Sequence, residues 1–119
     1  MPKRYLTANE FGNTLHQGKP VEVFLGGDSK AVLPTIHWLE IYLQEERIVC
    51  AYWKTEDPCD PEYRDLSTLV GDEDAIHYSF ETVDQCLEAL ELRFPGSTSR
   101  IVNFGLSGDE YVDYLKGVA

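Results

Sequence analysis

Residues 36–54 have the sequence IHWLEIYLQEERIVCAYWK, in which side chains alternate between two faces of an extended chain. One face carries Leu39, Ile41, Leu43, Ile48, Cys50 and Tyr52. The other face carries Trp38, Glu40, Tyr42, Val49, Ala51 and Trp53. Glu45 and Glu46 separate the two runs. We therefore predict a β-hairpin, with strands at 36–44 and 47–54, at the centre of a sheet.

The residues before the hairpin predict a helix and a strand. Thr7 and Glu10 form the Thr-x-x-Glu pattern of a capping box, which predicts a helix from about residue 8 to residue 17. Residues 21–25 alternate and predict a strand that ends at the Gly-Gly-Asp turn of 26–28. A short return strand is predicted at 31–33, where Pro34 ends it.

The residues after the hairpin begin with an acidic, proline-containing loop at about 55–75, roughly twenty residues with little regular pattern. Residues 76–80 predict a strand. A Thr-x-x-Gln box at 82–85 opens a helix that continues to about Phe94. Residues 100–104 predict a strand, and Ser-Gly-Asp-Glu at 107–110 predicts the cap of a last helix that closes at Gly117.

Strands gather early in the chain and helices gather late, which predicts an α+β fold. We expect a single domain over residues 1–119, with a mainly antiparallel sheet of about five to six strands and two to three helices packed on it. The apolar fraction of 43% and the charged fraction of 26% are normal for a folded domain. A domain of this size needs neither a disulfide nor a metal to hold its core.

The three cysteines, Cys50, Cys59 and Cys86, are odd in number and widely spaced. We expect three free thiols, two of them buried and Cys59 in the acidic loop. The basic opening Met-Pro-Lys-Arg is not followed by an apolar stretch of signal-peptide length, and no run approaches a membrane span. We therefore expect a cytoplasmic protein.

The acidic charge is confined to the middle of the chain. The net charge is −11, and residues 56–91 hold twelve acidic residues against one basic residue, whereas the other 83 residues hold nine of each. Nucleic acids and anionic membranes attract clustered Lys and Arg, so both are excluded as direct partners. One interpretation is a solvated face that keeps the protein soluble. Because concentrated like charges cost stability, the other interpretation is a surface for a basic protein.

No pattern indicates catalysis or metal binding. None of the three histidines, His16, His37 and His77, accompanies a nucleophile motif, and His16 falls at a helix end, where a cation suits the helix dipole. The acidic runs do not match a calcium-binding loop, and no histidine pair has the spacing of a zinc site. We therefore expect no enzymatic activity, no metal and no cofactor.

The candidate site is a protein-binding surface, because interfaces combine aromatic anchors with charged rims. Tyr63, between Glu62 and Arg64, is the best single contact residue. The predicted partner-binding residues are Glu56, Asp57, Asp60, Glu62, Tyr63, Asp65, Asp72, Glu73, Asp74 and Tyr78.

Other aromatic residues have two interpretations each. Trp38 and Trp53 are either anchors of the interface or core residues beneath the helices. Tyr111 and Tyr114 of the last helix, with the acidic residues beside them, are candidates for a second acidic and aromatic patch.

A small, acidic α+β chain without an active-site motif resembles the bacterial immunity proteins, which neutralise cognate toxins. The resemblance lies in size, in the acid cluster from Glu56 to Glu91, and in aromatic residues beside acids, such as Glu62-Tyr63 and Glu110-Tyr111. It implies a non-enzymatic inhibitor whose acidic surface covers the active-site cleft of a basic cytosolic toxin such as a nuclease. We expect the chain to be a monomer or a homodimer.

Two other functions stay open. A phage-encoded inhibitor that mimics nucleic acid, such as an anti-CRISPR protein, would use the same acidic surface. The second alternative is a small enzyme of unknown reaction. A pocket that is lined by both a carboxylate and His37 or His77 would favour this alternative.

Overall fold

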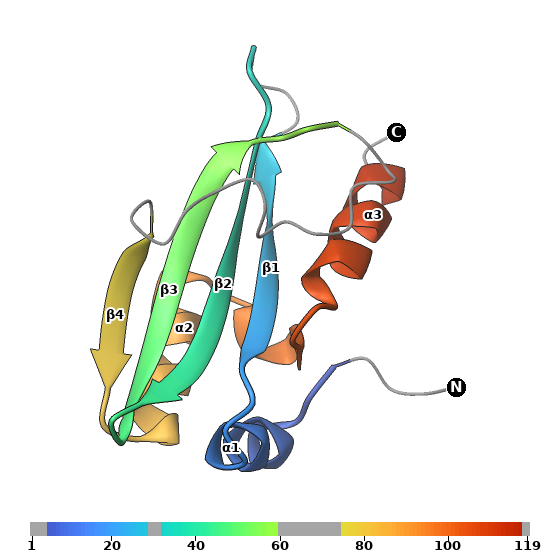
Figure 1. Ribbon diagram of the computed structural model, residues 1–119. Coiled ribbons are helices and arrows are strands. Elements are labelled where there is room, and N and C mark those ends of the chain that lie inside the picture. Colours follow the sequence, from blue (N-terminus) through green and yellow to red (C-terminus); the bar gives the residue numbers. More distant parts are fainter. Residues whose placement is uncertain (1–4, 29–31, 60–74, 118–119) are drawn as a thin grey trace.

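Two ten-residue strands, β2 (Thr35–Gln44) and β3 (Arg47–Glu56), form the predicted hairpin at the centre of the sheet in the computed structural model (Figure 1). The structure describes residues 5–28, 32–59 and 75–117. The strands pair along their whole length, and Glu45 and Glu46 form the turn with φ angles of 51° and 67°. Positive φ at both central residues is the turn geometry that matches the twist of a hairpin.

Three further strands extend this hairpin on both sides. β1 (Val21–Asp28) pairs with β2, β4 (Ile76–Phe80) pairs with β3, and β5 (Ile101–Asn103) pairs with β1. All pairings are antiparallel, and the strand order is β4-β3-β2-β1-β5.

The described residues also form the helices α1 (Ala8–His16), α2 (Val83–Arg93) and α3 (Ser107–Gly117), with a short 3₁₀ helix, η3 (Ser97–Ser99), after α2. The predicted α+β class is confirmed, since residues 5–28, 32–59 and 75–117 form an antiparallel sheet of five strands with three α-helices.

Both faces of the sheet are apolar, and helices cover them from opposite sides. α1 and α2 pack on one face, where the buried core consists of Phe11, Leu15, Val21, Val23, Leu39, Ile41, Ile48, Cys50, Cys86, Leu90 and Ile101. On the other face the buried core consists of Phe24, Ile36, Trp38, Ala51, Trp53 and Tyr111, the last from α3. Trp38 and Trp53 stack there with ring centroids 6.0 Å apart, so their interpretation as core residues is confirmed.

The first two helices begin at the predicted caps. Thr7 and Glu10 form the full capping box of α1, each side chain accepting a hydrogen bond from the other's backbone N–H. At α2, Thr82 accepts from the backbone N–H of Gln85, whose own side chain accepts from the N–H of Glu81. Both helix starts therefore follow from local sequence alone.

α3 begins differently, because a carboxylate from β1 accepts its first N–H group and one from the turn before it. The side chain of Glu22 is 7% exposed, and its Oε1 accepts hydrogen bonds from the backbone N–H groups of Gly105 (2.6 Å) and Ser107 (3.2 Å). A carboxylate at this position also interacts favourably with the helix dipole. The predicted local cap at 107–110 is therefore wrong. Ser107 is already the first residue of the helix, and its backbone N–H donates to Glu22, which lies 85 residues away in sequence.

The predicted return strand at 31–33 is wrong for residues 32 and 33, which form a bend, and residue 31 lies outside the described part of the chain. β2 begins only at Thr35, after Pro34. Proline has no N–H to donate to a strand ladder, so the chain joins the sheet after it. Val32 and Leu33 are left exposed at this end of the hairpin.

The three cysteines are free, as predicted, with Cys50 and Cys86 buried in the core under α2 and Cys59 exposed. Burial raises the pKa of each buried thiol to about 12, and the Cys86 thiol contributes further to the shift at Cys50. Both thiols therefore stay protonated in the folded protein well above their ordinary range.

We expect Glu22→Ala to lower the free energy of unfolding by about 2 kcal/mol, because it leaves the N–H groups of Gly105 and Ser107 without their acceptor. Glu22→Gln keeps an acceptor oxygen and should cost less. Urea unfolding measures both, with Glu88→Ala on the exposed face of α2 as the control, expected within about 0.5 kcal/mol of the parent protein. Equal losses for Glu22→Ala and Glu88→Ala would contradict this role.

The buried thiols predict a loss of stability as pH rises from about 9 to about 12. In that range thiols of the unfolded chain ionise while Cys50 and Cys86 stay protonated in the fold. Each thiol contributes a slope of about 1.4 kcal/mol per pH unit. The double variant Cys50→Ala, Cys86→Ala should therefore show a shallower decline in denaturant unfolding over this pH range, and an unchanged decline would refute the assignment.

Candidate functional site

Three of the ten predicted partner-binding residues, Glu56, Asp57 and Tyr78, lie in the described part of the chain. The other seven fall in residues 60–74, outside the described residues, and they remain predictions: Asp60, Glu62, Tyr63, Asp65, Asp72, Glu73 and Asp74.

Asp57 has an internal structural role at the end of β3. Its Oδ1 accepts a 2.5 Å hydrogen bond from the hydroxyl of Tyr111, which α3 places in the core, and a 2.8 Å bond from the N–H of Cys59. The N–H of Asp57 donates to the carbonyl of Pro34. Asp57 therefore joins the start of the acidic loop to α3.

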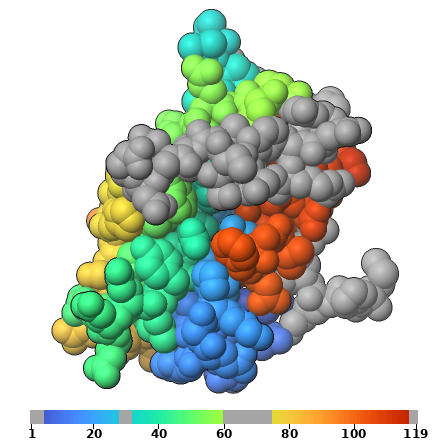
Figure 2. Space-filling model, in the orientation of Figure 1, coloured from blue at the N-terminus to red at the C-terminus, as the bar shows by residue number. Residues whose placement is uncertain are grey.

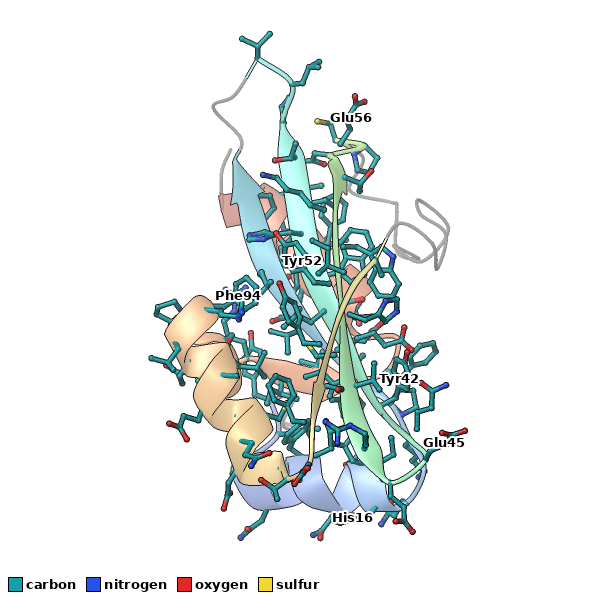
Figure 3. All side chains as sticks on the ribbon, turned by 90° about the vertical axis from the view of Figure 1, so that its left-hand side faces the viewer. His16, Tyr42, Glu45, Tyr52, Glu56 and Phe94 are labelled. Atoms are coloured by element: carbon teal, nitrogen blue, oxygen red, sulfur yellow. The ribbon has the colours of Figure 1, made fainter. Side chains whose placement is uncertain are left out.

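Glu56 and Tyr78 lie in different surroundings. Glu56 is exposed at the end of β3. In Figure 3 it lies at one end of the molecule, and His16 and Glu45 lie at the other. Tyr78, on β4, packs against the core under α2, with the Arg93 guanidinium 4.6 Å from the centroid of its ring. The structure thus does not bring Glu56 and Tyr78 into one cluster.

The second acidic and aromatic patch predicted on the last helix is wrong. Tyr111 is fully buried, and Glu110 is 4% exposed and accepts a hydrogen bond from the hydroxyl of Tyr5. Tyr114 packs with its ring edge toward Phe24, at a centroid distance of 5.4 Å. α3 turns these residues toward the sheet because β1 and β2 present an apolar face there.

An acidic groove lies at the end of the molecule where α2 begins. Its volume is about 330 Å³, and its carboxylates are Glu46 from the β2–β3 turn with Glu81 and Asp84 from the start of α2. The apolar lining consists of Leu43, Ile48 and Val83, and His16, in the last turn of α1, closes one side. We call this feature the acidic groove.

The carboxylates of the acidic groove are exposed and only weakly neutralised. Glu81 is 74% exposed and makes an ion pair of 3.7 Å with Arg47, which is itself 48% exposed. Exposed pairs of this kind contribute little to stability. The groove thus keeps an excess of negative charge above an apolar floor, in which Ile48 is 2% exposed.

Sequence reasoning included Glu81 and Asp84 in the acidic segment 56–91 but missed Glu46. The signal was present, because Glu45 and Glu46 were identified as the hairpin turn. What the sequence does not show is that α2 folds back under the sheet, which brings its first turn beside the hairpin turn.

A second hollow, of about 290 Å³, is lined by residues of β2, β3 and β4 on the sheet face that α3 partly covers. Figure 2 looks onto this face, with surface from β2 beside α3. Across the strands, Glu40 pairs with Ala51 and Ala51 pairs with His77. The small side chain of Ala51 leaves space between the carboxylate and the imidazole, with Tyr42 and Trp53 at the border. This hollow joins His77 to a carboxylate, the arrangement that favours the small-enzyme alternative.

Among the described residues, no group of three or more His, Cys, Asp or Glu side chains is placed to hold a metal ion. In the same part of the chain, no helix has the length and apolar character needed to cross a membrane. His16 lies in the last turn of α1, as predicted for a residue that suits the helix dipole.

Comparisons of this chain with protein-family models, with curated proteins and with solved structures found no match.

Proposed function

We propose that this protein binds a basic protein and inhibits it by occlusion, as an immunity protein does with its cognate toxin. The observation that carries the proposal is the acidic groove, where carboxylates from two separate elements surround an apolar floor. The partner contact is a Lys or Arg side chain, with its charged head among the carboxylates and its aliphatic stem on Leu43 and Val83.

The hairpin turn supports this proposal, because its two glutamates occupy an unfavourable conformation. Glu45 and Glu46 both have positive φ, a conformation that glycine adopts without steric cost and that asparagine tolerates better than glutamate. The two carboxylates are also adjacent, and they repel each other. Local stability does not favour Glu46 in this turn, and its carboxylate lines the acidic groove, which supports a role for it in binding.

The distribution of charge supplies the mechanism of association. A net charge of −11, concentrated in residues 56–91, attracts a basic partner before contact and speeds encounter. A nuclease fits this description, because its cleft holds the Lys and Arg side chains that bind phosphates. When the two proteins have bound, the acidic surface of this protein covers the cleft of the nuclease and excludes the nucleic-acid substrate.

Two alternative functions are separated from this proposal by different observations. An inhibitor that mimics nucleic acid would bind through the same carboxylates, and the identity of the captured partner separates it from an immunity protein. A small enzyme would instead use the hollow over Ala51, with His77 and Glu40 as the acid–base pair. Only the enzyme requires the imidazole of His77.

The double variant Glu81→Lys, Asp84→Lys tests the proposal by capture of a basic protein from host lysate and titration of that purified protein. We expect affinity to fall roughly 100-fold, since like charges placed together in an interface cost several kcal/mol. Thermal melting confirms that the variant is folded.

Two controls separate the possible sites. Glu56→Lys reverses the charge of a predicted partner-binding residue at the opposite end of the sheet, and a contact centred on the acidic groove predicts a much smaller loss of affinity there (Figure 3). His77→Ala should leave both capture and inhibition unchanged. Full affinity in the Glu81, Asp84 double variant would exclude the groove as the contact, and loss of a catalytic turnover in His77→Ala would favour the enzyme.

A further inference from the structure

A cavity with the opposite charge character lies at the other end of α2. Its volume is about 160 Å³, and its lining residues are Leu25, His37, Phe94, Pro95, Ser97 and Arg100. Leu25 and His37 come from β1 and β2, and the remaining four come from the segment that follows α2. We call it the Arg100 cavity. The acidic groove uses none of its residues.

One wall of the Arg100 cavity is a rigid aromatic cluster. Tyr52 and Phe94 stack with centroids 5.5 Å apart and an interplanar angle of 13°, and Figure 3 shows the two rings meeting between β3 and the end of α2. His37 meets both rings edge-on and forms a 2.9 Å hydrogen bond between its Nδ1 and the Tyr52 hydroxyl. These contacts hold the imidazole and the phenyl ring in fixed positions.

The segment that follows α2 forms another part of the lining, and hydrogen bonds to α2 hold it in place. The Ser97 hydroxyl donates to the carbonyl of Leu90, and Ser97 is 3% exposed. The Glu91 carboxylate accepts hydrogen bonds from the Thr98 hydroxyl and from the N–H groups of Gly96 and Thr98, and these bonds hold the pKa of Glu91 below its usual range. Because Glu91 is committed to this turn, the segment that carries Arg100 is anchored before any ligand arrives.

The polar lining of the Arg100 cavity is cationic in an otherwise acidic protein. Arg100 is half-buried, and no described residue accepts a hydrogen bond from its guanidinium or forms an ion pair with it. Lys54 pairs with His37 across β2 and β3, so both side chains point to the same face. Burial, together with the charge of Lys54, lowers the pKa of His37, which is therefore neutral at neutral pH.

We propose that the Arg100 cavity binds a small aromatic carboxylate. An apolar cavity of about 150 Å³ accepts a benzene ring, so this volume fits one six-membered ring. The ring packs against Phe94, Leu25 and Pro95, and the carboxylate accepts two parallel hydrogen bonds from the Arg100 guanidinium. This site is independent of the proposed function, because it lies at the opposite end of α2 from the acidic groove.

Titration of the full chain with benzoate, followed by ¹H–¹⁵N correlation spectra, tests this proposal. We expect saturable shifts confined to the amides of His37, Phe94 and Ser97 to Arg100, with a Kd of about 1 mM or tighter. Arg100→Gln should weaken binding at least tenfold, since it removes the bidentate donor. Arg47→Gln, which removes the same charge at the far end of β3, should bind benzoate like the parent protein.

Inorganic phosphate and benzyl alcohol are the two comparison ligands. The proposal expects weaker binding of both, because phosphate lacks the ring and benzyl alcohol lacks the charge. Equal affinity for phosphate and benzoate would replace the aromatic carboxylate with a general anion site and overturn the proposal. Absence of saturable benzoate binding, or equal benzoate binding in Arg100→Gln, would overturn it as well.

Discussion

The β2–β3 hairpin is apolar on both faces, so both faces of the sheet must be buried from water. The three helices pack on the sheet and bury them. α1 and α2 cover the face of Leu39, Ile41 and Cys50. α3 covers part of the face of Trp38 and Trp53, and it is held there from β1 by Glu22 and from the end of β3 by Asp57. Glu22 and Asp57 thus stabilise the fold through hydrogen bonds, a role that the net charge of the chain does not indicate.

The position of α2 under the sheet produces two surfaces of opposite character. Its first turn lies beside the hairpin turn and forms the acidic groove, in which Glu46, Glu81 and Asp84 surround an apolar floor. Its last turn lies beside β1 and β2, where Arg100 and His37 line a smaller cavity. A single helix therefore separates the surface that we propose for a basic protein from the one that we propose for a small anion.

Much of the fold follows from the sequence, because its signals are local. The period-two alternation of residues 36–54 predicts the hairpin, and Thr7 and Thr82 predict two helix starts. The start of α3 was not predictable, since its cap is a buried carboxylate 85 residues away. The acidic groove was predictable only in part. Glu81 and Asp84 belong to the acidic segment, whereas the position of Glu46 beside them depends on tertiary packing.

The central functional claim is that the acidic surface attracts and covers a basic protein. Its most direct test is the association rate of the captured, purified partner as a function of salt concentration. Electrostatic attraction predicts a fall of at least about tenfold between roughly 0.02 M and 0.3 M salt, with a much smaller change in the dissociation rate. An association rate that does not change over this range would contradict the account.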